Sequence, residues 1–95
     1  MKKIKLKKFD FEIVIGTKVR VGVLSSENDE WGDEAKNMIC DYLPDVQHIS
    51  LPSGVYNNDV EGDDLEKIVF DFDQEMWCPD YLLYKDENGK IQEKK

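Results

Sequence analysis

The chain has 95 residues, of which 21 are acidic and 13 basic, giving a formal net charge of −8. This length predicts a single domain with a modest core. No apolar run approaches the ~20 residues needed to cross a bilayer, and Lys2 and Lys3 lead into an alternating pattern rather than a signal-peptide core. Cys40 and Cys78 are far apart and indicate free thiols rather than a disulfide framework. We therefore expect a cytoplasmic domain and no membrane-spanning or disulfide-rich scaffold.

The charge is distributed unevenly along the chain. Residues 1–24 hold seven Lys or Arg against two acids, whereas residues 25–80 hold two Lys against sixteen acids. A middle segment with a net charge of −14 repels nucleic acid and favours a basic protein surface or a cation. The plain alternative is that this charge only keeps the protein soluble.

The first 24 residues predict a β-hairpin. Apolar side chains alternate with polar ones from Ile4, change phase at Lys7-Lys8 and resume at Phe9, which indicates a bulge or a break between two short strands. A second alternating segment covers residues 18–24. A three-residue or bulged turn would pair Ile15 with Val19 and keep the apolar side chains on one face. The five lysines in the first eight residues suit an exposed edge strand.

The middle of the chain predicts an amphipathic helix over about 29–43, packed on one face of a sheet. Its apolar side chains recur at helical spacing, from Trp31 through Ala35, Met38 and Ile39 to Tyr42. Ser26 and Asp29 have the spacing of a capping box, and Pro44 ends the helix. Gly32 indicates either close packing or a helix that begins after it. Carboxylates near a helix N-terminus also have a simple electrostatic explanation.

The remaining segments predict three or four further strands in one mainly antiparallel sheet, so the fold class is α+β. Residues 46–51 form a short strand that would complete a βαβ unit over 19–51, with an antiparallel arrangement as the alternative. Residues 53–64 predict a loop, and 67–73 alternate as a strand. Segments 81–85 and 90–92 flank Asp86-Glu87-Asn88-Gly89, which is typical of a hairpin turn.

Two acidic groups are candidate metal or catalytic sites. Asn57, Asp59, Glu61 and Gly62 match the first positions of a calcium-binding loop, but Ile68 stands where the bidentate glutamate is needed. Asp71 and Asp73 would project from one face of the strand over 67–73 and could hold a magnesium ion or act as acid and base. More often, such a pair is the solvated face of an amphipathic strand.

The other chemistry-bearing residues give weaker signals. His48, Cys40 and Cys78 are too scattered for a zinc site, and an acidic neighbourhood disfavours a reactive thiolate. The chain contains no glycine-rich phosphate loop, serine elbow or HExxH motif. We therefore predict no enzyme activity, no catalytic residues, no metal and no cofactor.

The hypothesis favoured by these features is a small acidic binding protein that blocks a basic, nucleic-acid-binding surface of another protein. A phage or mobile-element inhibitor of a host defence nuclease would have this character, with carboxylates imitating phosphates. An immunity protein that neutralises a nuclease toxin has the same surface chemistry. A small metal-binding protein or enzyme using residues 57–73 and a homodimer that pairs through the first strand are further alternatives. Charge and aromatic character predict these partner-binding residues: Asp29, Glu30, Asp33, Glu34, Tyr56, Asp59, Glu61, Asp63, Asp64 and Trp77.

Overall fold

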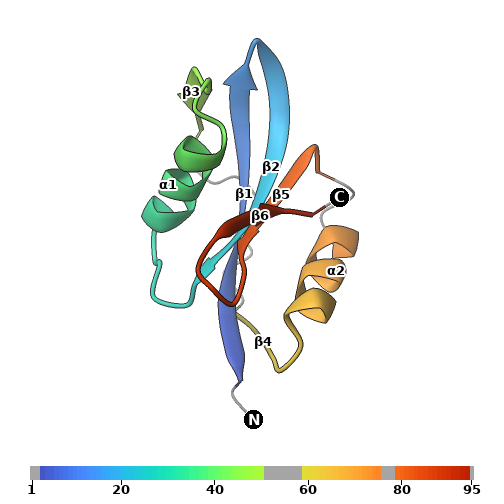
Figure 1. Cartoon of the computed structure of the whole chain (residues 1–95). Helices are drawn as coiled ribbons and strands as arrows, with labels where there is room; N and C mark the ends of the chain where they lie inside the picture. Colours follow the sequence, from blue (N-terminus) through green and yellow to red (C-terminus); the bar gives the residue numbers. More distant parts are fainter. Residues whose placement is uncertain (1–2, 51–58, 76–78, 95) are drawn as a thin grey trace.

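The protein is an α+β domain in which a mainly antiparallel sheet carries a helix on each face (Figure 1). The computed structural model describes residues 3–50, 59–75 and 79–94. The elements in chain order are β1 (Ile4–Ile15), β2 (Thr17–Ser26), α1 (Asp33–Tyr42), β3 (His48–Ile49), β4 (Asp59–Gly62), α2 (Leu65–Glu75), β5 (Tyr81–Lys85) and β6 (Ile91–Glu93). The strand order is β3-β1-β2-β5-β6, and β4 pairs with the outer edge of β1. The predicted fold class is confirmed.

The long β1–β2 hairpin is the frame of the sheet. Its register is unbroken from Leu6↔Ser26 to Ile15↔Thr17, so the predicted break at Lys7-Lys8 is wrong. The phase change has a different cause. In a strand, successive side chains point to opposite faces, and here Leu6 packs with the α2 cluster whereas Phe9 packs with the α1 cluster.

The hairpin turn is tighter than expected. Gly16 occupies its tip with a φ of 77°, a left-handed conformation that suits glycine. The predicted pairing of Ile15 with Val19 is therefore wrong, because Val19 lies opposite Ile13. The apolar residues nevertheless remain opposite one another, as in the pair of Phe11 with Val21.

Helix α1 is shorter than predicted and leaves Trp31 outside it. Gly32, with a φ of 79°, is the N-cap residue, and Trp31 is 76% exposed rather than packed on the sheet. The predicted capping box does not form at Ser26. The Asp29 carboxylate instead accepts the Ala35 backbone N–H at 3.0 Å, which satisfies one of the free donors in the first turn. Of the predicted apolar stripe, Ala35, Met38 and Ile39 are buried and Tyr42 packs against the same cluster.

The segment predicted as a strand over 67–73 lies inside helix α2. Its buried residues Ile68, Val69 and Phe72, with Leu65 before them, have the i, i+3, i+4, i+7 spacing of a helix face. Phe70, which the strand pattern placed in the core, is 53% exposed. The prediction of a single helix on one face is therefore corrected to two helices on opposite faces of the sheet (Figure 1).

The predicted βαβ unit over 19–51 does not form. After α1 the chain returns to the outer edge of β1, where Ile49 lies antiparallel to Ile13, and the Gln47 N–H donates to the Val14 carbonyl. The parallel pair joins β2 and β5 instead, from Val21↔Tyr81 to Val23↔Leu83. Part of the predicted loop over 53–64 is also a strand, since β4 covers 59–62; residues 53–58 lie outside the described ranges.

The C-terminal hairpin is confirmed. Leu83 lies opposite Glu93 in the β5–β6 pair, and Gly89 takes a φ of 79° in the turn. The Asp86 carboxylate fixes this turn, because it accepts the backbone N–H groups of Asn88 and Lys90, each at 2.9 Å. Neither α1 nor α2, as described, is long and apolar enough to cross a membrane.

Candidate protein-binding end

Three acidic segments lie in the half of the molecule away from the β1–β2 turn, in the lower half of Figure 1. They are the β2–α1 connection with the first two residues of α1 (27–34), the first two residues of α2 with the two before them (63–66) and the β5–β6 turn (86–89). Together we call them the acidic end. An ion pair of 3.0 Å joins Glu34 in the first segment to Lys85, the residue directly before the third. A groove joins the second and third. The β5–β6 hairpin thus lies beside each of the other two acidic segments.

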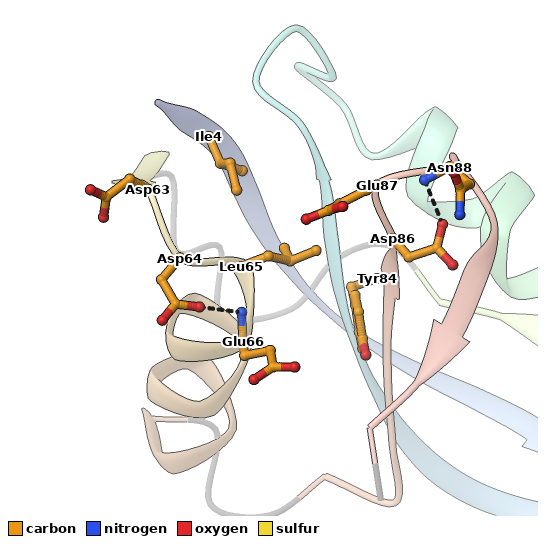
Figure 2. A pocket seen from close by; sticks show the side chains of 9 residues that line it. All are labelled: Ile4, Asp63, Asp64, Leu65, Glu66, Tyr84, Asp86, Glu87 and Asn88. Atoms are coloured by element: carbon orange, nitrogen blue, oxygen red, sulfur yellow. Dashed lines mark hydrogen bonds between the residues drawn. The ribbon is translucent and has the colours of Figure 1, made fainter. Parts of the chain in front are cut away.

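The groove lies between the start of α2, the first residue of β1 and the β5–β6 turn, as Figure 2 shows. Its volume is about 620 Å³. The lining residues are Ile4, Asp63, Asp64, Leu65, Glu66, Tyr84, Asp86, Glu87 and Asn88. Ile4, Leu65 and Tyr84 are half-buried and flank the α2 core cluster, so the groove has an apolar floor and an acidic rim.

Two of the rim carboxylates stabilise the local structure. Asp64 accepts the Glu66 and Lys67 backbone N–H groups at 3.1 and 3.3 Å, which caps α2 at its N-terminus. Asp86 accepts the Gln92 side-chain amide as well as the turn N–H groups, and these hydrogen bonds hold the pKa of its carboxyl below the ordinary value.

The remaining rim carboxylates are open to solvent. Asp63, Glu66 and Glu87 are exposed, and none of their carboxylates forms an ion pair with another described residue. Their charges are therefore available to an incoming cationic group.

The acidic residues around the β2–α1 connection also include some that support the fold and some that are open to solvent. Asp29 is 8% exposed and accepts hydrogen bonds from the Ser25 hydroxyl and the Ala35 N–H, so its carboxylate supports the fold. Glu34 is half-buried beside Lys85. Glu30 and Asp33 are exposed on either side of Trp31 and Gly32. Glu27 is exposed as well, so the outward-facing carboxylates of this segment are Glu27, Glu30 and Asp33.

The other predicted partner-binding residues fall into two groups. Glu61 lies in β4, where the Lys3 ammonium is 2.7 Å from its carboxylate; this hydrogen-bonded pair lowers the pKa of Glu61 and raises that of Lys3. Asp59 is also in β4, and its backbone lies opposite Lys7. Tyr56 and Trp77 lie outside the described residues, so their part in the site stays a prediction.

The predicted metal-binding patterns look different in the structure. Asp59 and Glu61 belong to a paired strand rather than a loop. Asp71 and Asp73 are on helix α2 instead of a strand face, where Asp71 pairs with Lys67 at 3.3 Å and Asp73 with Lys94 at 2.6 Å. Within residues 3–50, 59–75 and 79–94, no three His, Cys, Asp or Glu side chains are grouped to hold a metal ion.

Comparison with known proteins found no family model, no curated protein and no solved structure that matches this chain.

Sequence reasoning missed the groove and the exposure of Trp31. Glu66, Tyr84 and Glu87 come from segments whose meeting depends on α2 being a helix, whereas the alternation over 67–73 predicts a strand. The signal for that helix is nevertheless present, because Asp64 precedes an i, i+3, i+4, i+7 apolar pattern that begins at Leu65. At α1 the corresponding signal in the sequence is Gly32. Its positive φ in the structure marks the helix boundary and leaves Trp31 before the helix.

Proposed function

We propose that this chain is a non-catalytic binding protein whose acidic end covers a basic, nucleic-acid-binding surface on another protein. A phage or mobile-element inhibitor of a host defence nuclease would act in this way. The observation that carries the proposal is the grouping of exposed carboxylates from three separate segments in the half of the molecule away from the β1–β2 turn. The exposed members without an ion pair among the described residues are Glu27, Glu30, Asp33, Asp63, Asp64, Glu66 and Glu87.

Such a surface competes with nucleic acid through simple electrostatics. A nucleic-acid-binding protein presents Lys and Arg side chains that neutralise phosphates. Carboxylates held on a folded surface can accept the same charge-assisted hydrogen bonds without requiring a flexible chain to become ordered. Opposite charges also speed association, and salt weakens that attraction. The proposed complex should therefore form readily at low salt and weaken at high salt.

The test is affinity capture from a host-cell lysate with the tagged full chain, at low and high salt, followed by mass spectrometry. We expect a nucleic-acid-binding protein to be retained, released by high salt and displaced by added duplex DNA or RNA. Retention of proteins that neither bind nucleic acid nor respond to such competition would overturn the proposal. The identity of a retained nuclease, as a defence enzyme or a toxin, separates an inhibitor from an immunity protein.

A matched pair of variants connects the captured protein to the acidic end. Glu30→Gln with Asp33→Asn removes two exposed charges there. Asp41→Asn with Asp45→Asn removes two exposed charges near the other end of α1 and has the same effect on net charge. We expect the first variant to lose captured protein at a lower salt concentration than the wild type, and the second to behave like the wild type. Equal behaviour of the two variants would mean that only net charge matters and would overturn the assignment of the interface to the acidic end.

A further inference from the structure

Trp31 is the most exposed large apolar side chain in the described part of the chain. Its exposed fraction is 76%, and Phe70 follows with 53%. Burying a tryptophan removes a large apolar area from water, so leaving one open on a folded surface forgoes considerable stabilisation. Exposed tryptophans of this kind are common anchors of protein interfaces.

The backbone on both sides of Trp31 is held in place. On one side, Asp29 is buried and fixed by hydrogen bonds of 2.7 Å from the Ser25 hydroxyl and 3.0 Å from the Ala35 N–H. On the other, Gly32 lies directly on the core, since a Cβ there would be 3.1 Å from Phe11 Cζ. The indole is therefore presented from an ordered connection, and little backbone entropy would be lost when a partner binds it.

The surroundings of Trp31 favour a cationic group. A hollow of about 360 Å³ beside the indole is lined by Asn28, Asp29, Glu30, Asp33 and Glu34. Elsewhere the protein places lysines over aromatic rings, with Lys8 5.7 Å from the Phe72 centroid and Lys94 5.2 Å from that of Phe70. Among the described residues, no cation lies over the Trp31 ring. The aromatic face and the exposed carboxylates of Glu30 and Asp33 are thus open to a cation from outside.

We propose that Trp31 is the anchor of the interface and that an arginine side chain of the basic partner stacks on its indole. This inference rests on the function proposed above and assigns a specific contact to it. The planar guanidinium can lie flat on the ring, while its N–H groups donate to the carboxylates of Glu30 and Asp33. Lysine has the same charge but lacks the planar group, so arginine is preferred.

The test uses short capped peptides as probes, because they isolate this contact from the rest of an interface. A tri-arginine peptide is titrated into the ¹⁵N-labelled full chain. A tri-lysine peptide is the control for charge without a planar group, and a tri-citrulline peptide is the control for the same shape without charge. The Trp31 indole N–H signal is assigned with Trp31→Phe. We expect this signal and the amides of residues 28–34 to shift most with tri-arginine, less with tri-lysine and not with tri-citrulline.

Two substitutions of exposed aromatic residues form the matched comparison. Trp31→Ala should weaken tri-arginine binding about two- to fivefold, the factor expected for one exposed cation–π contact. Phe70→Ala should leave the affinity unchanged, and Trp31→Phe should retain part of it. Because Trp31 is exposed, Trp31→Ala should also unfold at the temperature of the wild type.

The outcomes separate this inference from the proposed function. The role of Trp31 would be overturned if Trp31→Ala bound tri-arginine with wild-type affinity. It would also be overturned if tri-arginine shifted the amide signals of residues 63–66 and 86–88, around the groove, as much as those of residues 28–34. In either case, capture of a nucleic-acid-binding protein could still succeed. Arginine binding at Trp31 together with failed capture would leave the contact in place and overturn the proposed function.

Discussion

The two faces of the sheet are packed in different ways, although both are covered by a helix. On the α1 face, β1 and β2 contribute Phe9, Phe11, Ile13, Val21 and Val23, all with 2% exposure or less. This layer is made of apolar side chains meeting an apolar helix stripe, and hydrophobic burial and close packing account for it.

The α2 face has charged residues within its apolar layer. Lys8 and Asp10, on the same face of β1, are 7% and 9% exposed. Lys8 lies over the Phe72 ring, and Asp10 is 3.1 Å from Arg20 Nη2. Buried charges need partners because desolvation is costly. One face is therefore stabilised by shape and apolar area, whereas the other also depends on specific pairs.

The largest effect on stability should come from Gly32, whose backbone lies against core side chains of the α1 face. Gly32→Ala places a Cβ 3.1 Å from Phe11 and 3.3 Å from Phe9, at a φ of 79°. We expect it to lower the free energy of unfolding by about 2–4 kcal/mol, because left-handed strain and overpacking combine. Urea denaturation measures this change.

Gly89→Ala is the control for that prediction. Gly89 has the same φ of 79°, but no heavy atom lies within 4 Å of the position that an alanine Cβ would take, so only the backbone strain applies. We expect the free energy of unfolding to fall by about 1–2 kcal/mol. Equal losses in the two alanine variants would show that the contact with Phe9 and Phe11 contributes nothing and would weaken the picture of a tightly packed α1 face.

The next effect tests the charged pair on the α2 face. Arg20→Met removes the cation beside Asp10, whose Oδ1 has no hydrogen-bond partner among the described residues. We expect the free energy of unfolding to fall by about 1–3 kcal/mol, as for a buried polar group left unsatisfied. The fall should be smaller than for a fully buried ion pair, because the Arg20 side chain is 47% exposed.

A double-mutant cycle isolates the pair. Asp10→Asn removes the buried negative charge, so adding it to Arg20→Met should recover part of the lost stability. The coupling is measured as a difference between the double variant and the sum of the single variants. Strict additivity would contradict a specific Asp10–Arg20 interaction and would make the two faces energetically alike.

The same contrast explains which parts of the fold could be predicted from the sequence. The β1–β2 pairing, the burial of Ala35, Met38 and Ile39 on α1 and the turn at Asp86 follow from local patterns, and these parts of the prediction are confirmed. The phase change at Lys7-Lys8 wrongly predicts a break, because it reflects a strand buried on both faces, which depends on a second helix. The strand predicted in place of that helix is also wrong, since Ile68, Phe70 and Phe72 fit an alternating pattern as well as a helical one.

The candidate site was predictable only in part, for a related reason. The acidic character of Glu30 and Asp33 is clear from composition, but burial decides which carboxylates face outward. Asp29 has the same chemistry as its neighbours and is used inside the fold. The groove depends on residues from three segments, and only their tertiary arrangement brings Leu65, Tyr84 and Glu87 together.

The smallest effect should come from Asp86, a carboxylate outside both packed layers that contrasts with buried Asp10. The Gln92 amide, and then the Lys90 and Asn88 N–H groups, hold the pKa of Asp86 below its ordinary value. A carboxyl whose pKa is lower in the folded than in the unfolded chain stabilises the fold fully above the unfolded pKa. That stabilisation is lost as the pH falls through the folded pKa.

Asp86→Asn should therefore lower the melting temperature at neutral pH, and the difference from the wild type should shrink in acid, below the ordinary pKa of an aspartate. Glu87→Gln, at the neighbouring exposed position, should leave the melting temperature at neutral pH unchanged, because its carboxylate has no hydrogen-bond partner among the described residues. A difference at Asp86 that is constant with pH would assign the effect to the shape of the turn instead of its charge. Solvent reaches Asp86 and screens its interactions, so its contribution should stay below that of the Asp10–Arg20 pair.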